Sequence, residues 1–414
     1  MGWLKDRWKR IAFFFAILGP GIITATVDND AGGITTYSVA GAHFGYAILW
    51  TLIPITIVLI IVQEMAARMG AVTGQGLADL IRENFGIKLT FFIMVGLIIA
   101  NVATTIAEFA GIAAATELFG LSKYIVIPFC ALAVWLLVTK ASYRTVEKAF
   151  LIMTVFYVAY IVSGIMAKPD WGEVFHGLLV PTFAFSAPYI LIVIGLIGTT
   201  ITPWMQFYLQ SSIVEKGIKE EEYKYSKWDV ILGCITTDVV SFFIIVATAA
   251  TLFMGGISIN SAQDAAIALR PFAGQFAMVL FAAGLFAAGL FGAAILPLST
   301  SFYICEGLGW ESGVNKKFKD APQFYLLFSV IILIGAAVVL IPKIPLITLM
   351  ISSQVINGII LPVILIAMIK LVSNRKLMGK HAYPQWYLSI LWVVSAIIIA
   401  LTLVLVVTSL MGKV

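Results

Sequence analysis

Long apolar stretches constrain this chain more than any other feature of its sequence. About eleven of them are long enough to cross the hydrocarbon core of a bilayer, which takes roughly 20 residues as a helix. They lie near residues 11–41, 46–67, 89–118, 123–139, 149–167, 186–213, 229–253, 273–303, 323–342, 344–371 and 386–411. The connections between them are short. The sequence therefore predicts an all-α integral membrane protein with a single transmembrane domain over residues 1–414 and no soluble module.

Composition and charge support the same class. Hydrophobic residues make up 61% of the chain, charged residues only 11%, and the mean hydropathy is +1.03, as in polytopic membrane proteins. The net charge of +5 could indicate an anionic partner, but the positions of the basic residues explain it as topology. All but five of the 26 Lys and Arg residues fall in connections on one side; the five are Lys123, Lys168, Arg270, Lys343 and Lys413.

This alternation predicts how the chain sits in the lipid bilayer. Because basic residues stay on the cytoplasmic side, the N-terminus is expected inside and the C-terminus outside a prokaryotic cell (plasma) membrane. No basic patch is left over for nucleic acid. The sequence does not set the oligomeric state, and a monomer is compatible with it.

Two carboxylates interrupt the first apolar stretch, within GPGIITATVDNDAGGITTYS at residues 19–38. An ionised Asp at a helix centre costs about 2.5–3.5 kcal/mol, so Asp28 and Asp30 need a partner or a function. Gly32 and Gly33 follow and let the backbone leave the helix, turning carbonyl oxygens toward a ligand. The stretch predicts a discontinuous helix with a cation site, in which an unwound turn could bring Asn29 or Asp28 inward. The alternative is a water-exposed loop that binds nothing.

A second interruption is expected in the sixth stretch. Pro203 lacks an N–H and disfavours a helical Thr202, and Gly198 and Thr199 add flexibility and polarity to the same turn. A lone proline is usually a tolerated kink, but these neighbours favour a site. Breaks five spans apart are typical of an inverted repeat, because a tandem copy of five helices must insert upside down. We expect repeats at 11–167 and 186–371, with 386–411 as an extra helix.

Three further polar residues lie within apolar stretches. Glu108 is expected to line the ion path or to bond a neighbouring helix, since a Glu facing lipid would be costly. Gln354 offers an amide oxygen that suits a hard cation, or a helix-to-helix hydrogen bond. Asp238 is expected close to the cytoplasmic end of the seventh stretch, facing an inner vestibule.

Several motifs resemble the Nramp family of divalent metal transporters, whose first-helix signature is Asp-Pro-Gly-Asn. They are Gly19-Pro20, Asp30, Gly45-Tyr46, the run at 67–74, Ile106-Ala107-Glu108, the Pro-Asp-Trp-Gly at 169–172, Gly198 to Pro203, Cys305-Glu306-Gly307 and Ser353-Gln354-Val355. The resemblance implies a leucine-transporter-like inverted repeat that carries divalent cations between broken helices one and six. It implies a ligand carboxylate from Asp30, a carbonyl from Thr199 and an approach of Gln354 on closure.

The chain also departs from the family pattern. Ala31 and Gly33 replace the signature's Pro and Asn, Thr202 replaces the sixth-helix Met, Trp204 replaces a His, and Thr105 replaces the acidic residue of the third helix. Loss of the thioether leaves an all-oxygen site suited to harder cations, and Gly33 is expected to leave a roomier one. Loss of the His and the acid removes the family's titratable proton path. These changes resemble those of the Nramp-related magnesium transporter branch.

The favoured hypothesis is uncoupled, alternating-access uptake of Mg²⁺, with Mn²⁺ as a second substrate and no cofactor beyond the transported ion. Water completes the shell of Asp30, Thr199, Thr202 and Gln354. The nearest alternative is a proton-coupled Mn²⁺ or Fe²⁺ symporter in which Glu108 or Asp28 carries the proton. An amino-acid symporter of the same fold is disfavoured, because two acids would repel a substrate carboxylate. An enzyme is not expected, since the apolar stretches hold no Gly-x-Gly-Asp, HExxH or Ser/His arrangement.

Overall fold

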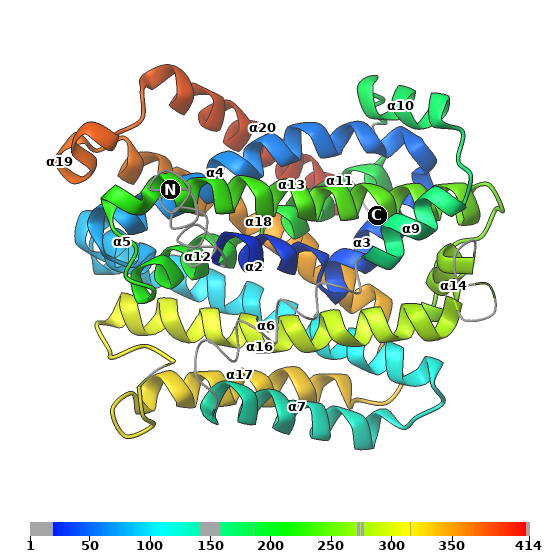
Figure 1. The fold of residues 1–414 in the computed structure, drawn as a ribbon, viewed down its shortest axis with the longest axis horizontal. Coiled ribbons are helices and arrows are strands. Elements are labelled where there is room, and N and C mark those ends of the chain that lie inside the picture. The colour runs from blue at the N-terminus through cyan, green and yellow to red at the C-terminus, as the bar shows by residue number, and fades with distance from the viewer. Residues whose placement is uncertain are drawn as a thin grey trace, which may run out of the picture.

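The computed structural model is built of helices stacked side by side (Figure 1) and describes residues 20–140, 158–184, 186–270, 274, 277–314 and 316–410. The helices are α2 (Pro20–Thr26), α3 (Ala31–Phe44), α4 (Leu52–Thr73), α5 (Leu77–Phe85), α6 (Ile87–Leu118), α7 (Lys123–Lys140), α9 (Val158–Met166), α10 (Trp171–Leu179), α11 (Ala187–Thr200), α12 (Pro203–Glu215), α13 (Tyr223–Thr248), α14 (Ala262–Ala266), α16 (Ala277–Leu308), α17 (Pro322–Val339), α18 (Leu346–Val372), α19 (Arg375–Met378) and α20 (Gln385–Leu410). Short 3₁₀ segments include η1 (Val27–Asn29) and η2 (Gly45–Thr51).

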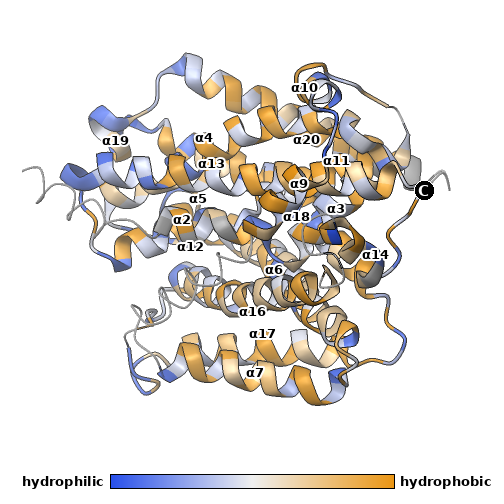
Figure 2. Cartoon of the chain, turned by 45° about the vertical axis from the view of Figure 1, so that its right-hand side comes forward, coloured by the Kyte–Doolittle hydropathy of each residue, from blue (hydrophilic) through white to orange (hydrophobic). Residues whose placement is uncertain are grey.

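The apolar helices of the structure correspond to the predicted apolar stretches, apart from the parts of the first and fifth stretches that lie outside the described residues. Nine described segments are long and apolar enough to span a membrane. One of them, Ala31–Thr73, joins α3 and α4 through η2 and so covers two predicted stretches. The fifth predicted stretch is described only as α9, and residues 11–19 of the first lie outside the described residues. Figure 2 shows apolar residues along most of the helices and hydrophilic ones in α19 and in several connections.

Both predicted helix breaks are present. The first half of the first helix consists of α2 and η1. Asp30 follows with an extended backbone (φ −64°, ψ −178°), and the second half, α3, begins at the next residue. The first half of the sixth helix is α11. Thr202 has an extended backbone (φ −65°, ψ 132°), and the second half, α12, begins at Pro203. The prediction of two discontinuous helices is therefore confirmed.

Helix α2 is short, and α13 holds its N-terminal end. The Asp229 carboxylate accepts from the Gly21 N–H at 2.7 Å and from the Ile22 N–H at 3.3 Å. These are N–H groups at the start of a helix, which have no partner within it. The backbones also touch: a Cβ on Gly21 would lie 2.7 Å from the Val230 nitrogen, and one on Gly233 would lie 2.8 Å from the Gly21 oxygen. Small residues at this crossing fix the half-helix against α13.

The long helices α6 and α16 run alongside each other, and α7 and α17 form the layer beyond them (Figure 1). Glycines allow the close approach. A Cβ on Gly289 would lie 2.8 Å from the Glu108 carbonyl, and one on Gly292 would overlap the Glu108 carboxyl group. One turn after Glu108, Gly111 lies directly against Ala31, the first residue of α3. Helix α6 thus places Glu108 beside the first break.

Replacing Asp229 by Ala is expected to lower stability, because two N–H groups of α2 lose their acceptor and the helix end loses a favourable negative charge. A capping residue contributes typically about 1 kcal/mol. Thermal unfolding of the purified protein, followed by tryptophan fluorescence, measures the loss. The Asp229→Asn variant keeps an acceptor oxygen and should lose less. Equal melting temperatures for wild type and Asp229→Ala would contradict the role of this cap.

Candidate metal site

Two carboxyl groups meet at the first break. Asp30 is the N-cap of α3, and its Oδ1 accepts from the Gly33 N–H at 2.6 Å. Glu108 of α6 accepts from the Ala31 N–H through Oε2 at 3.2 Å. The Asp30 and Glu108 carboxyl groups also lie within hydrogen-bonding reach of each other, and both residues are buried. Two such groups do not both carry a full charge unless a cation or a shared proton lies between them.

Gln354 of α18 reaches the same place. A Cβ built on Gly32 would overlap the Gln354 Nε2 and would lie 3.3 Å from Asp30 Oδ1. A side chain at this position would therefore displace the end of the Gln354 side chain from Asp30. The Gln354 Oε1 accepts from Asn357 Nδ2 at 3.1 Å, whereas Nε2 has no hydrogen-bond partner in the described part of the chain. Because the two ends of an amide can be exchanged by rotation, Gln354 can present its oxygen to an ion beside Asp30.

The second break contributes oxygens from the opposite side. A Cβ built on Gly33 would overlap the Asp28 carbonyl oxygen and would lie 3.0 Å from Thr199 Oγ1. That hydroxyl donates to the Asp28 carbonyl at 3.4 Å. The expectation that Gly33 leaves a roomier site is wrong for this structure, because the Asp28 carbonyl and the Thr199 hydroxyl fill the space. Glycine instead lets these two oxygens approach the start of α3.

Thr202 closes the second break. Its Oγ1 donates to the Thr199 carbonyl at 2.6 Å and lies 3.0 Å from the Gly198 carbonyl. These carbonyls belong to the last turn of α11, where the helix no longer supplies donors. Gly198 in turn lies directly against the backbone of Gln354 and Gly358 in α18. The residues of the second break thus fix both the Thr199 oxygens and the distance to Gln354.

Asn357 is a residue that the sequence analysis missed. Its amide nitrogen lies 3.0 Å from Thr104 Oγ1 of α6 and 3.1 Å from Gln354 Oε1. It therefore links α6, which carries Glu108, to the amide that faces Asp30. A polar residue one turn after Gln354 in an otherwise apolar helix was the available signal.

Two expected site residues lie elsewhere. The Asn29 amide donates to the Thr237 carbonyl at 3.2 Å and to its hydroxyl at 2.6 Å, and its oxygen accepts from Ser241 at 3.1 Å. Asn29 therefore ties η1 to α13 and does not face Asp30. The expected position of Asp238 is also wrong: it lies about four turns into α13, in the middle of the helix rather than near its cytoplasmic end.

The two positions of the family's proton path hold no titratable group. The Thr105 hydroxyl donates to the Asn101 carbonyl of its own helix at 2.7 Å, and its methyl faces Gly335 of α17. Trp204 is buried in the first turn of α12, and its ring makes an edge contact with Tyr208 at 6.0 Å between centroids. Both side chains fill space, and neither can carry a proton.

The donor atoms gathered here are oxygens: carboxylates from Asp30 and Glu108, the Thr199 hydroxyl, the Asp28 carbonyl and the Gln354 amide. In the described ranges no group of three or more His, Cys, Asp or Glu residues could hold a metal ion. A site with few carboxylates and several neutral oxygens suits a hard or borderline divalent cation that keeps some of its water.

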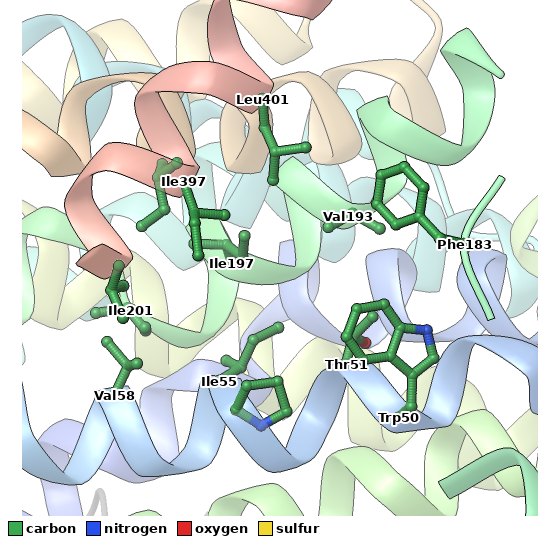
Figure 3. A pocket seen from close by; sticks show the side chains of 13 residues that line it. Trp50, Thr51, Ile55, Val58, Phe183, Val193, Ile197, Ile201, Ile397 and Leu401 are labelled. Carbon is green, nitrogen blue, oxygen red and sulfur yellow. The ribbon is translucent and has the colours of Figure 1, made fainter. Parts of the chain in front are cut away.

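An apolar pocket lies away from these oxygens, between α4, α11 and α20 (Figure 3). Its lining is apolar and includes Ile55, Val193, Ile201 and Ile397. Its one hydroxyl, on Thr51, already donates to the Ile48 carbonyl at 2.7 Å. This pocket offers no set of ligands for a cation. It is an apolar gap between the extra helix α20 and the bundle.

Sequence comparisons agree with the motifs. Residues 21–408 match the profile of the family described as natural resistance-associated macrophage protein-like, Nramp. The chain is 27% identical over 412 residues to a protein named divalent metal cation transporter MntH from Klebsiella pneumoniae, covering 96% of this chain and 95% of the relative. It is 24% identical over 413 residues to a protein of the same name from Bacillus subtilis, covering 94% and 91%.

Solved structures show the same arrangement of helices. A crystal structure of the Eremococcus coleocola manganese transporter, in complex with an aromatic bis-isothiourea compound, matches with a TM-score of 0.80 and 22% identity, covering 95% of this chain and 86% of that one. The nucleobase-cation-symport-1 family transporter Mhp1 matches with a TM-score of 0.58 and 14% identity, over 96% and 91%. The predicted leucine-transporter-like fold is thereby confirmed. With its profile match spanning nearly the whole sequence, this chain is a member of the Nramp family.

Proposed function

We propose that this protein is a transporter that moves divalent metal cations, Mn²⁺ foremost, across a membrane by alternating access. The observation that carries the proposal is the pair of buried carboxyl groups, Asp30 and Glu108, placed where the two broken helices meet and surrounded by neutral oxygens. The names of the relatives from Klebsiella pneumoniae and Bacillus subtilis, and of the structure from Eremococcus coleocola, support the class of substrate.

The two kinds of half-helix end have different roles at the site. The Asp28 carbonyl at the end of η1 and the Thr199 hydroxyl at the end of α11 lie beside the start of α3. We propose that these oxygens, with the Thr199 carbonyl, replace the water that a cation loses. The start of α3 presents N–H groups instead. Those of Gly33 and Ala31 hold the Asp30 and Glu108 carboxylates in place, so the charges that face the ion are oriented before it arrives.

The candidate ligands come from both repeats, which suggests how the transporter would close around an ion. Asp30 belongs to the first repeat, and Thr199 and Gln354 belong to the second, so one ion contacts both halves. An ion bound this way stabilises the state in which α3, α11 and α18 lie closest together. We propose that binding at Asp30 draws the Gln354 amide onto the ion and that release reverses this approach.

A specific observation supports Mg²⁺ as a second cargo. The family's sixth-helix Met is Thr202 here, so the described site holds hydroxyl, carbonyl and carboxyl oxygens in place of a soft thioether. We propose that Mg²⁺ competes with Mn²⁺ for this protein. The membrane potential favours inward movement of either divalent ion by about 4.6 kcal/mol per 100 mV.

The Asp30→Asn variant is expected to lose Mn²⁺ uptake by at least about tenfold, because a buried carboxylate ligand becomes a neutral amide. Uptake into proteoliposomes, with calorimetry on the same purified protein, measures this. Asp79→Asn is the control, since Asp79 lies on α5 and pairs with Arg82 away from the breaks. Unchanged binding and uptake by Asp30→Asn would remove Asp30 from the site and defeat the proposed function.

The Thr202→Met variant tests the magnesium proposal. Restoring a thioether is expected to weaken competition by Mg²⁺ against Mn²⁺ uptake by roughly tenfold, because sulfur binds Mg²⁺ poorly. Ile201→Met is the matched control: it adds the same side chain one residue earlier, where it faces the apolar pocket (Figure 3). If wild-type uptake of Mn²⁺ is insensitive to a large excess of Mg²⁺, the magnesium proposal is wrong and the manganese one stands.

A test of Glu108 distinguishes proton-coupled transport from uncoupled transport. It is the titratable group beside Asp30, since Thr105 and Trp204 carry no proton. If Glu108 carries a proton, Mn²⁺ uptake into vesicles containing a pH-sensitive dye should acidify the interior, and Glu108→Gln should abolish the acidification. We expect acidification, as the proton-coupled alternative requires. Uptake at a constant internal pH would instead establish the uncoupled mechanism.

A further inference from the structure

We propose a second divalent-cation site, formed by the side chains of Asp28 and Asp238, between η1 and the middle of α13. It is distinct from the Asp30 site, and it rests on the proposed function, since it would load the same cargo. The comparisons assign no role to either residue.

Both carboxyl groups are buried and without partners. Asp28 is 2% exposed and Asp238 6% exposed. None of their four carboxyl oxygens has a hydrogen bond within the described residues. The Thr56 hydroxyl lies near Asp238, but it donates to the Leu52 carbonyl at 2.7 Å. Buried ionised groups are almost always hydrogen-bonded, paired or bound to a metal, so four oxygens without any partner require an explanation.

The fold brings the two groups together through their neighbours in sequence. Asn29, which follows Asp28, donates to both the carbonyl and the hydroxyl of Thr237, which precedes Asp238. Ser241, one turn further along α13, donates to Asn29 Oδ1 at 3.1 Å. This anchor fixes η1 on α13, and the Asp28 and Asp238 carboxyl groups interact electrostatically as a result.

The described ionisable groups that interact with Asp28 and Asp238 are all acidic. The ionisable groups that act on Asp28 are Asp238 and Asp30, and Tyr37 and Cys234 lie close enough to feel both members of the pair. Neither carboxylate forms a salt bridge in the described part of the chain. One divalent cation would neutralise both groups at once, whereas a monovalent ion would leave a net buried charge. The donors are again oxygens, which suits the same class of ion.

A pocket leads to this site. Asp238 is the acidic residue in the lining of a cavity of about 370 Å³ between α4, α10 and α13, which also contains Thr56 and Phe175. Helix α10 lies in the connection between the two repeats, which the charge distribution places outside the cell. A cation entering here meets Asp238 first, then Asp28.

Asp28 joins the two sites. Its carboxyl group interacts electrostatically with Asp238 and with Asp30, and its backbone carbonyl lies beside Gly33 and Thr199 in the Asp30 site. An ion held by this side chain would therefore be bound by the same residue whose carbonyl contributes to the Asp30 site. The second site is a loading position on the route to Asp30.

The experiment counts Mn²⁺ ions on the full-length protein in detergent, at saturating Mn²⁺, by elemental analysis and by electron paramagnetic resonance. Wild type is expected to bind two ions per chain with spectral broadening from their mutual magnetic interaction. Asp28→Asn and Asp238→Asn should each bind one ion without broadening, and each keeps the backbone carbonyl of Asp28. Asp229→Asn is the matched control: an equally buried acid on α13 whose oxygens already accept from Gly21 and Ile22, and it should bind two.

The outcomes separate this inference from the proposed function. One ion per wild-type chain, retained in both Asp28→Asn and Asp238→Asn but lost in Asp30→Asn, would overturn the second site and leave the proposed function intact. An unchanged count in Asp30→Asn would overturn the proposed function instead. Initial uptake at low Mn²⁺ should fall about tenfold in Asp238→Asn and recover at high Mn²⁺, because only loading is impaired. If Na⁺ at tenfold excess displaces one of two Mn²⁺ ions, the site is monovalent and the proposal is wrong.

Discussion

Every backbone N–H and C=O inside a bilayer needs a partner within the protein, and this requirement governs the two helix breaks. At the first break, Asp30 and Glu108 accept from the free N–H groups of Gly33 and Ala31. At the second, the Thr202 hydroxyl donates to the Thr199 carbonyl. The side chains that repair the backbone are thus the ones that surround the candidate ion. The site is a consequence of how the interrupted helices satisfy their own hydrogen bonds.

Glycine makes that arrangement geometrically possible. Gly198 lets α18 approach α11 at the break, and Gly32 lets the Gln354 amide lie against α3. A methyl group at Gly198 would overlap the backbone of α18, and one at Gly32 would overlap the end of the Gln354 side chain. In a membrane, where apolar side chains gain little by leaving lipid, such close contacts supply much of the helix association. The same contacts set the distance between ligands, so packing and coordination are fixed together.

The sequence was sufficient for features that depend on local chemistry. The breaks follow from residue types that disfavour helix where they stand, and the all-α membrane fold follows from the length of the apolar stretches. The sequence was insufficient where a distant helix decides. Asn29 looked like a ligand because it lies between two acids, but Thr237 and Ser241 of α13 bind it. Gly33 looked like added room, but Asp28 and Thr199 occupy that room.

Only the tertiary structure distinguishes the surroundings of the two acidic residues at the first break. By residue type alone, Asp28 and Asp30 are equivalent candidates, and only the family resemblance favours Asp30. In the fold, Asp30 lies beside Glu108, whereas Asp28 interacts electrostatically with Asp238, so one short segment contributes to the candidate site and to the proposed loading position. If both positions are occupied as proposed, the two divalent ions repel each other, so an ion arriving at the outer position would weaken the binding of the inner one. By thermodynamic reciprocity the inner ion lowers the affinity of the outer position equally. Tight binding and timely release can then coexist in the same site, because arrival of the next ion drives departure of the last.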